Sequence, residues 1–267
     1  MKSVNELLDL KGRVSLITGG AGHIGQVIAE GLAEQGSNLV LLDVNTEKLN
    51  AVAEGLKHKY SVNVMTLVVN LEDEIEIKSV ADKVGKEFGK LDIMVNNAAF
   101  VGDSSLDGWA TSFEKQSIDT WRRAIEVNLT APFCLIKSCA SLFEKSGAAS
   151  IVNIGSIYGI SGPDLSLYEG TAMGNPAAYA ASKGGLTQLT RWLSTVLAPN
   201  VRVNTVSPGG VFRGQPESFV NRFTEKTPLK RMATEEDIKG TVVYLASDLS
   251  KYVTGQNIVV DGGFTVW

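Results

Sequence analysis

The sequence contains only two cysteines and two histidines among its 267 residues. Cys134 and Cys139 lie five residues apart in a segment that we predict to be one helix, so we interpret them as small buried residues of a reducing compartment. His58 stands between two lysines at a polar helix end, and His23 belongs to a glycine-rich loop. Because neither histidine has the neighbours that a metal site needs, we predict no bound metal.

The sequence also lacks an excess of positive charge and any long hydrophobic run. Its formal net charge is −4, which argues against nucleic acid or an anionic membrane surface as a partner. The first ten residues contain no apolar core of a signal peptide, and no apolar run approaches the length of a membrane span. With 44% hydrophobic and 20% charged residues, the composition is that of an ordinary globular protein. We therefore expect a soluble, cytoplasmic protein.

Short β-branched runs alternate with amphipathic stretches along almost the whole chain. The runs are apolar nearly throughout, as in parallel strands buried on both faces. We predict strands at Val14–Thr18, Leu39–Asp43, Val62–Val69, Ile93–Asn96, Ile151–Ile154, Val201–Val206 and Ile258–Val260. We predict helices at Ile24–Gln35, Thr46–Lys57, Glu72–Phe88, Thr120–Lys145, Ala177–Leu197 and Thr234–Ala246, the last one capped by Thr234. The alternation predicts one α/β domain over residues 1–267, with a Rossmann-type, doubly wound parallel sheet of about seven strands flanked by helices.

Two long stretches, Phe100–Ile118 and Ile160–Pro176, show neither helical nor strand periodicity. In doubly wound sheets ligands bind outside the carboxyl ends of the strands, where both stretches should emerge. We expect these two loops (about 100–118 and 160–176) to serve the substrate, together with a third segment at about 209–228. Disorder, or contact between subunits, is the alternative interpretation.

The segment from Thr18 to Gly25 follows the first predicted strand and opens the first helix. Glycines in such a loop let the backbone approach the pyrophosphate of a dinucleotide at the helix N-terminus. Asp43 ends the second strand 18 residues after Gly25. A carboxylate there can accept both ribose hydroxyls of adenosine and would repel a 2′-phosphate, so we predict NAD rather than NADP. The alternative role of Asp43 is to cap the helix that begins near Thr46.

Tyr179 and Lys183 are four residues apart, so both polar groups lie on one face of a predicted helix. A nearby ammonium favours the phenolate and would lower the pKa of the tyrosine from about 10 toward the working pH. Such a pair suits proton transfer, although tyrosine and lysine also meet at this spacing by chance. A strand end that carries Ser156 precedes the pair.

These segments resemble the short-chain dehydrogenase/reductase family over essentially the whole chain. The glycine loop is similar to the family's T-G-x-x-x-G-x-G, with His23 in place of the middle glycine, and we expect Gly22 to take over the unusual backbone φ. The segment ending in Asn97, Ala98 and Ala99 resembles the family's strand that ends in N-N-A-G beneath the cofactor.

The resemblance also implies the catalytic roles. Ser156 would orient the substrate oxygen, and Tyr179 would be the acid/base. Lys183 would lower the pKa of Tyr179 and hold the nicotinamide ribose. Asn128 matches the family position that anchors a water molecule of the proton relay.

The implied cofactor contacts extend along most of the same edge of the sheet. Asn70 and Leu71 stand where an aspartate and an apolar residue usually hold the adenine, and Val211 would offer backbone atoms to the carboxamide. Arg213, where the family usually has threonine, would bind pyrophosphate, meet a substrate anion or point to solvent. The full predicted set is Gly19, Ala21, His23, Ile24, Gly25, Asp43, Val44, Asn70, Leu71, Asn97, Ala98, Tyr179, Lys183, Pro208, Gly209 and Val211.

These residues predict an NAD(H)-dependent oxidoreductase that moves a hydride between nicotinamide and a secondary alcohol or ketone. The spacing of 23 from Ser156 to Tyr179 exceeds the family's common spacing. We expect polar residues of this loop and of the other long segment to favour a hydroxyl-rich, sugar-like small molecule: Asp164, Tyr168, Glu169, Thr171 and Asn175, with Asp103, Asp107 and Trp109. The long loop and His23 also give a likeness to dehydrogenases of surface-polysaccharide and flagellin-sugar pathways.

Two other functions stay open at this point. A 3-oxoacyl thioester reductase shares the scaffold but usually prefers NADP and a basic residue near the adenosine ribose, where this chain has Asp43, Val44 and Asn45. A non-catalytic dinucleotide-binding sensor or scaffold typically loses the tyrosine or the lysine of the catalytic pair, and this chain has both.

The C-terminal segment from Tyr252 to Gly263 resembles the family region that makes two-fold contacts. It implies a homo-oligomer, a tetramer or a dimer. Trp267, if exposed, would be an unusual apolar residue on the surface of a monomer.

Overall fold

A parallel sheet forms the centre of the chain in the computed structural model, which describes residues 1–101 and 106–267. Its seven strands are β1 (Val14–Thr18), β2 (Asn38–Asp43), β3 (Val64–Val68), β4 (Ile93–Asn96), β5 (Ala149–Ile154), β6 (Val201–Pro208) and β7 (Asn257–Val260). They lie in the order β3-β2-β1-β4-β5-β6-β7, and each neighbouring pair is parallel. The predicted doubly wound sheet of about seven strands is confirmed.

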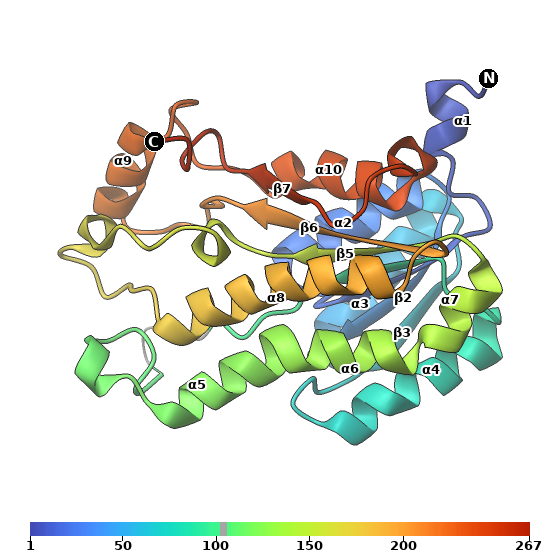
Figure 1. The fold of residues 1–267 in the computed structure, drawn as a ribbon, viewed down its shortest axis with the longest axis horizontal. Coiled ribbons are helices and arrows are strands. Elements are labelled where there is room, and N and C mark those ends of the chain that lie inside the picture. The colour runs from blue at the N-terminus through green and yellow to red at the C-terminus, as the bar shows by residue number, and fades with distance from the viewer. Residues whose placement is uncertain (102–105) are drawn as a thin grey trace.

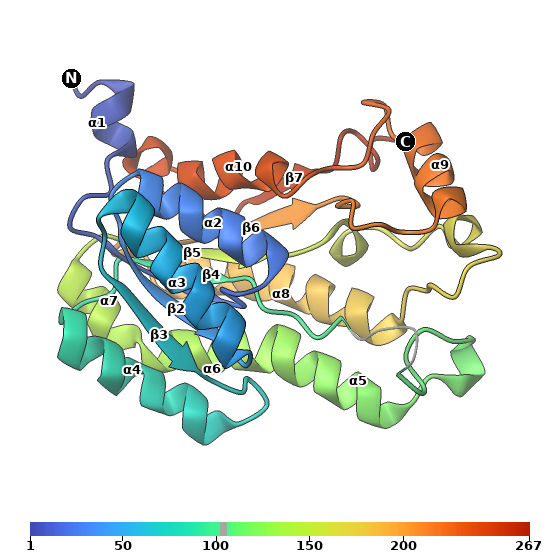
Figure 2. The ribbon, with the colours of Figure 1, turned by 180° about the vertical axis from the view of Figure 1, so that it is seen from behind.

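Helices cover both faces of the sheet (Figures 1 and 2). The helices are α1 (Val4–Leu8), α2 (His23–Glu34), α3 (Thr46–Tyr60), α4 (Glu74–Phe88), α5 (Ile118–Ile125), α6 (Ala131–Ser138), α7 (Ala140–Ser146), α8 (Ala177–Val196), α9 (Glu217–Lys226) and α10 (Glu236–Ala246). One face is packed by α2, α3 and α10, and the other by α4, α6, α7 and α8. Two hydrophobic cores result, one on each side of the sheet.

Helix α4 shows how the sequence specifies these elements. Asp73 caps its N-terminus by accepting hydrogen bonds from two backbone N–H groups, and Gly89 ends it in the left-handed conformation. Ile77, Val80 and Val84 recur at helical spacing and are buried against the sheet. Each such side chain contributes about 1.5–3 kcal/mol when it leaves water.

The single helix predicted for Thr120–Lys145 is wrong. The chain forms α5, a wide π-helical turn at Glu126–Thr130, α6, and then α7 after a break at Cys139. Pro132 explains the wide turn, because it has no N–H for the carbonyl of Asn128 four residues earlier. Cys139 lies at the break and is fully buried as expected, whereas Cys134 is only partly buried.

Other element ends also differ from the prediction. Helix α10 begins at Glu236, and the hydroxyl of Thr234 donates to the Asp237 carboxylate instead of capping the backbone. Helix α9 arises inside the segment predicted as a loop, where Phe219 and Phe223 lie one turn apart on its buried side. No helix in the described parts of the chain is long and apolar enough to cross a membrane.

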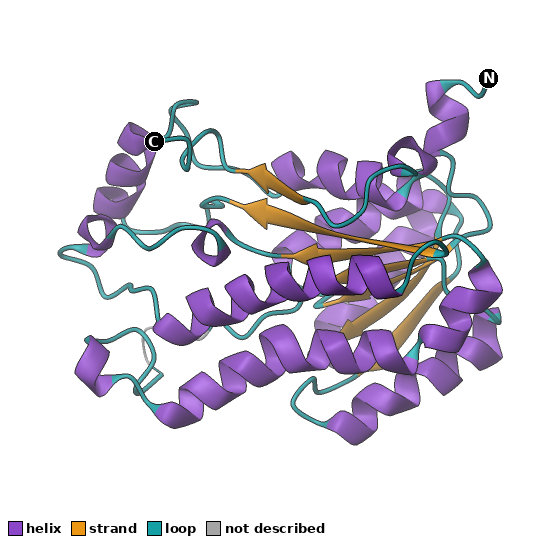
Figure 3. Cartoon of the chain, in the orientation of Figure 1, coloured by secondary structure: helices purple, strands orange, loops and turns teal. Residues whose placement is uncertain are grey.

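The carboxyl ends of the strands point toward the end of the molecule where α9 and the long loops gather (Figure 3). Strand order reverses between β1 and β4, because the chain winds outward through β2 and β3 and then returns. A crevice opens at such a switch point. The architecture thus places the glycine loop, the end of β4 and the start of α8 around one opening.

Candidate active site

The larger of two adjoining cavities, of about 550 Å³, opens at the carboxyl edge of the sheet. The predicted cofactor residues line it except for Ala21 and Gly25, which support the loop behind it. The lining members of that set are Gly19, His23, Ile24, Asp43, Val44, Asn70, Leu71, Asn97, Ala98, Tyr179, Lys183, Pro208, Gly209 and Val211. Ser156 and Arg213, which the sequence analysis also singled out, line it as well. The sequence argument missed other lining residues, among them Glu72, Val127 and Ile154.

Two glycines make the tight turn between β1 and α2. Gly19 has φ +64°, and a Cβ on Gly25 would lie 2.0 Å from the carbonyl oxygen of Gly19. The expectation for Gly22 is wrong, because its φ is −79°. His23 begins helix α2 with an exposed side chain, so a residue other than glycine fits there without backbone strain.

The carboxylate of Asp43 is held by two backbone N–H groups. Oδ2 accepts from Ala21 N at 3.0 Å, and Oδ1 accepts from Asn45 N at 3.0 Å. Asn45, not Asp43, caps helix α3 by accepting from Lys48 N, so the capping alternative is wrong. No lysine or arginine lines the cavity at the ends of β2 and β3, a stretch that lies wholly within the described residues.

Asn97 joins the ends of β1 and β4 below the larger cavity. Its Nδ2 donates to the carbonyl oxygens of Thr18 and Gly19, at 3.0 and 3.2 Å. The hydroxyl of Thr18 in turn accepts from the N–H groups of Asn97 and Ala98. This network fixes the floor of the crevice, because it ties the loop to two neighbouring strands.

Ser156, Tyr179 and Lys183 come together where the two cavities meet. Lys183 is 2% exposed, and its Nζ donates to the carbonyl oxygen of Ile154 at 2.8 Å. The same Nζ lies 5.8 Å from the centre of the Tyr179 ring. Ser156 hydrogen-bonds to Tyr179 and accepts from Tyr158 N at 3.1 Å, which orients its hydroxyl.

Burial controls the pKa of both titratable groups in this cluster. It raises the pKa of Tyr179 above its ordinary value, and the hydrogen bond with Ser156 opposes that shift. It lowers the pKa of Lys183 to about 8. The pKa of Tyr179 is therefore raised, not lowered as expected, because desolvation of the phenolate is the largest cause of its shift.

Asn128 holds the end of β4 to the helical layer. It is 1% exposed, its Oδ1 accepts from Phe100 N at 2.6 Å, and its Nδ2 donates to the hydroxyl of Ser182 at 3.0 Å. The side chain lies behind the cavity wall, to which its neighbour Val127 contributes directly. Its carbonyl lacks the usual helical donor because residue 132 is proline.

The smaller cavity, of about 230 Å³, shares Ser156 and Tyr179 with the larger one. All three long segments contribute to its wall. Its other lining residues are Val101, Trp109, Ile157, Tyr158, Tyr168, Met173, Gly174, Asn175, Pro176, Gly209, Gly210, Gln215, Phe219, Phe223 and Met232. The wall is mainly aromatic and aliphatic, so the polar lining expected from the sequence is wrong in extent.

One ion pair and three hydrogen bonds to backbone carbonyl oxygens attach the 160–176 loop to helix α9. Asp164 forms an ion pair with Lys226, and Arg222 donates to the carbonyl oxygens of Ser166, Leu167 and Glu169. Asp107 is exposed, and Asp103 lies outside the described residues. Tyr168 and Asn175 are the expected polar loop residues that line the smaller cavity.

Arg213 lines the larger cavity near the start of α10. Its Nε donates to Glu235 at 3.4 Å, and its backbone N–H donates to the side chain of Gln215. The carboxylate of Glu235 also lies 3.9 Å from Nδ1 of His23. One carboxylate thus lies beside both Arg213 and His23 at the mouth of this cavity.

Sequence comparisons relate the chain to oxidoreductases. A family model described as enoyl-(acyl carrier protein) reductase matches residues 19–265. The chain is 33% identical to the 3-oxoacyl-(acyl-carrier-protein) reductase of Thermotoga maritima, over 96% of this chain and 99% of that protein. It is 35% identical to the trans-4-hydroxycyclohexanecarboxylate dehydrogenase of Sinomonas cyclohexanicum, over 95% and 93%. The post-translational flagellin modification protein A of Campylobacter coli is 27% identical, over 96% and 99%.

Solved structures repeat the fold over nearly the full length. A gluconate 5-dehydrogenase from Burkholderia cenocepacia in complex with NADP and tartrate has a TM-score of 0.88 at 26% identity, covering 99% of this chain and 100% of that chain. An NAD+-bound xylitol dehydrogenase has a TM-score of 0.85 at 28% identity, covering 95% and 99%. The similar proteins therefore include complexes with either nicotinamide dinucleotide.

Proposed function

Because the chain belongs to the short-chain dehydrogenase/reductase family, we propose that it transfers a hydride between NAD(H) and a secondary alcohol or ketone. Family membership makes the chain an oxidoreductase acting on CH–OH groups. The observation that carries the finer proposal is the meeting of the two cavities at Ser156 and Tyr179, beside buried Lys183. A hydride carrier on one side and a substrate on the other would meet at an acid/base hydroxyl.

The larger cavity fits a nicotinamide dinucleotide. Gly25 lets helix α2 pack directly against the glycine loop, because a Cβ there would lie 2.0 Å from the carbonyl oxygen of Gly19. The N-terminus of α2 is thereby held at the cavity, where it would face a pyrophosphate. Asp43 would hold the adenosine ribose, and Lys183 the nicotinamide ribose. The bound nicotinamide would supply or accept the hydride. NAD is the proposed cofactor because the Asp43 carboxylate, without a lysine or arginine beside it, would repel a 2′-phosphate.

Tyr179 is the proposed proton donor for ketone reduction. Burial raises its pKa, so the phenol carries its proton at neutral pH and can give it to the substrate oxygen. Ser156 would hydrogen-bond to that same oxygen. An ammonium has three donors and Lys183 uses one on Ile154, so further N–H groups can stabilise the phenolate that forms.

Asn128 is the proposed anchor of the relay that returns the proton. Its side chain is occupied by Phe100 and Ser182, which leaves its backbone carbonyl as the acceptor. Because Pro132 cannot donate to that carbonyl, a water molecule bound there could pass a proton toward Lys183. The side chain then positions the turn, and the backbone atom performs the chemistry.

A polar, hydroxyl-bearing and sugar-like substrate is proposed. Gluconate and xylitol dehydrogenases among the structural neighbours, and the flagellin modification protein among the relatives, favour it. The aromatic wall of the smaller cavity restricts how many polar groups such a substrate can pair. A 3-oxoacyl thioester reductase is the second candidate, favoured by the Thermotoga maritima relative.

A cytoplasmic homo-oligomer, a tetramer or a dimer, is also proposed. Val259 on the edge strand β7, Tyr252 and Trp267 are all exposed apolar or aromatic residues near the C-terminus. A second copy of the chain would cover them. The two free cysteines suit a reducing compartment.

The first test is fluorescence titration with NADH and NADPH, followed by turnover on gluconate, xylitol, cyclohexanediols and acetoacetyl-CoA. Tighter binding of NADH with turnover of a polyol or diol supports the proposal. NADPH preference with turnover of acetoacetyl-CoA alone would establish the thioester reductase. Cofactor binding without turnover of any substrate would favour the non-catalytic sensor or scaffold.

A further inference from the structure

The charged side chains that line the larger cavity are divided between its two ends. Asp43 and Glu72 follow strands β2 and β3, whereas Lys183 contacts the end of β5 and Arg213 follows β6. Strands β1 and β4 lie between these two pairs in the sheet. No carboxylate of the described residues lines the second end, and no charged residue among them lines the smaller cavity. The lysine and arginine of this cavity thus gather at the proposed place of hydride transfer.

Arg213 is the accessible cation of the two. Its side chain is 40% exposed, whereas Lys183 is 2% exposed and donates to a backbone carbonyl oxygen. The guanidinium of Arg213 contacts Glu235 through Nε alone, at 3.4 Å. Its two terminal nitrogens have no hydrogen-bond partner among the described residues. The end of the guanidinium is therefore free to bind an anion through two parallel hydrogen bonds.

The segment that carries Arg213 is held in place. Val211 pairs with Ala233, and the N–H of Phe212 donates to the carbonyl oxygen of Ala233 at 2.8 Å. The backbone N–H of Arg213 donates to the side chain of Gln215 at 2.7 Å, and Gln215 lines both cavities. Arg213 thus stands on supported backbone beside the junction of the cavities, and less order is lost when such a side chain binds a ligand.

Arg213 also lies close to the reacting group. Burial is the largest influence on the pKa of Tyr179 and raises it, whereas the positive charge of Arg213 acts in the opposite direction. Because the influence of a charge falls off with distance, the guanidinium lies near the Tyr179 hydroxyl. An anionic group on Arg213 would therefore belong to a molecule that also reaches Tyr179.

The pyrophosphate of the cofactor has donors of its own. Gly22 is the N-cap of helix α2 and has no side chain that could bond to the first turn. The N–H groups that begin this helix are therefore available for phosphate oxygens. Arg213 is left for an anion that the cofactor does not supply.

We propose that Arg213 binds a carboxylate of the substrate, so that the enzyme acts on hydroxy acids, such as sugar acids, in preference to neutral polyols. This inference rests on the proposed function and narrows its substrate class. The carboxylate is separate from the reacting oxygen, which Ser156 and Tyr179 serve, and takes no part in hydride transfer. Arg213 is thus a specificity-determining residue.

The test compares hydroxy acids with their neutral carboxamides, which have nearly the same shape. The probes are gluconate, 3-hydroxybutyrate and 3-hydroxycyclohexanecarboxylate, each beside its amide, in the NAD-linked oxidation of the full-length enzyme. Arg213→Met removes the charge at similar length, and Arg213→Lys keeps the charge without the planar guanidinium. Arg122→Met is the control, because the Arg122 side chain is 75% exposed and lines neither cavity. Each variant is also titrated with NADH.

For Arg213→Met we expect kcat/KM on the preferred acid to fall by about 10- to 100-fold, because a hydrogen-bonded ion pair with the substrate is lost. On the corresponding amide it should change by less than about threefold. Arg213→Lys should retain part of the acid-to-amide ratio, and Arg122→Met all of it. The Kd for NADH should stay within about threefold of the wild type, which also shows that each variant is folded.

An unchanged acid-to-amide ratio in Arg213→Met, with turnover of both probes, overturns this inference and leaves the proposed function intact. If that variant instead binds NADH more weakly, Arg213 serves the pyrophosphate and the inference is overturned as well. An equal loss on acid and amide indicates a structural role and overturns it too. Wild-type turnover of xylitol or a cyclohexanediol, but of none of the acids, contradicts the inference alone. Absence of turnover on every alcohol contradicts the proposed function with it.

Discussion

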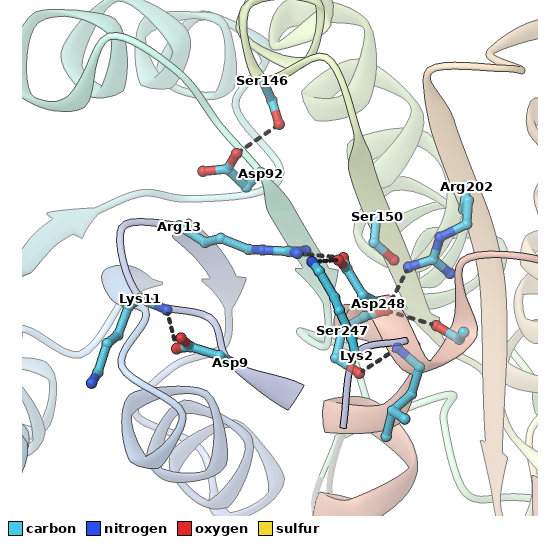
Figure 4. Close-up of polar contacts among 12 residues, drawn as sticks. Lys2, Asp9, Lys11, Arg13, Asp92, Ser146, Ser150, Arg202, Ser247 and Asp248 are labelled. Atoms are coloured by element: carbon cyan, nitrogen blue, oxygen red, sulfur yellow. Dashed lines mark hydrogen bonds and ion pairs between the residues drawn. The ribbon is translucent and has the colours of Figure 1, made fainter. Parts of the chain in front are cut away.

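The polar and charged groups at the two edges of the sheet differ in how many hydrogen-bond and ion-pair partners they have. At the amino edge, Asp92, Arg202 and Asp248, all labelled in Figure 4, have two or more partners each. At the carboxyl edge, Lys183 has one hydrogen-bond acceptor and Arg213 has one ion-pair partner among the described residues. The same sheet thus carries a saturated edge that supports folding and an unsaturated edge that can bind ligands.

Asp92 and Arg202 illustrate the amino edge. The carboxylate of Asp92 accepts from Val14 N, the hydroxyl of Ser146 and Nζ of Lys90, at 2.8, 2.6 and 3.1 Å. The guanidinium of Arg202 donates to carbonyl oxygens at the end of α10 and in the following turn. Removing one partner of such a hydrogen-bonded charge is destabilising, because the remaining groups stay in the protein interior without a partner.

The largest expected effect is the loss of turnover in Tyr179→Phe. Removing the acid/base oxygen should lower kcat by about 10²- to 10⁴-fold, while NADH still binds. Stopped-flow turnover and fluorescence titration measure the two properties. Tyr252→Phe, on a fully exposed ring, is the control and should keep full activity. Unchanged kcat in Tyr179→Phe would contradict the role of the carboxyl edge.

The corresponding change at the amino edge is Asp92→Ala. It leaves the buried N–H of Val14 and the half-buried hydroxyl of Ser146 without their acceptor, and we expect the free energy of unfolding to fall by about 2–4 kcal/mol. Urea denaturation measures this loss, and kcat of the remaining folded enzyme should be unchanged. Asp119→Ala, whose side chain is 90% exposed, should cost less than about 0.5 kcal/mol. A catalytic defect in folded Asp92→Ala would contradict the assignment of the amino edge to folding alone.

Asp43→Ser tests a ligand-directed charge at the carboxyl edge. Loss of the carboxylate should shift the NAD/NADP preference, measured as a ratio of kcat/KM, toward NADP by about 10- to 100-fold. Glu47→Gln removes an equal charge from the exposed first turn of α3 and should leave the ratio unchanged. An equal shift in both variants would mean that net charge, not the position of Asp43, sets the preference.

Lys183→Met should stabilise the fold while abolishing activity. Burial lowers the pKa of Lys183 to about 8 from 10.5, so keeping it charged in the folded state costs roughly 3 kcal/mol below pH 8. Loss of the hydrogen bond to Ile154 offsets about 1–2 kcal/mol of that. The expected net gain is therefore about 1–2 kcal/mol at pH 7.

The gain in stability expected for Lys183→Met should decrease as the pH rises. Between pH 8 and 10.5 the unfolded chain binds the proton that folded Lys183 has lost, so wild-type stability rises with pH relative to the variant. Urea denaturation at pH 7 and 9.5 should therefore show the gain shrinking at the higher pH. Arg202→Met at the amino edge should instead destabilise the fold at both values. A Lys183→Met variant that is less stable than the wild type at pH 7 would remove the distinction between the two edges.

The sequence by itself determined the strands and most helices, because their apolar periodicity is a local property that survives folding. It also indicated Asp43, Ser156, Tyr179 and Lys183, since each occupies a strand end or helix face that the topology must bring to one edge. The break at Cys139 could not be read from periodicity, because the apolar pattern runs through it. Pro132 was the available signal for the wide turn.

Only the tertiary structure decided what the long loops do. Their residues have no period, so the sequence could not tell that Asp164 and Glu169 face away from the smaller cavity while Asn175 lines it. Likewise, the direction of the Tyr179 pKa shift depends on burial, which comes from the packing of all the surrounding elements. Local pattern specifies which residues reach the carboxyl edge, and packing between distant segments sets the environment that each of them meets there.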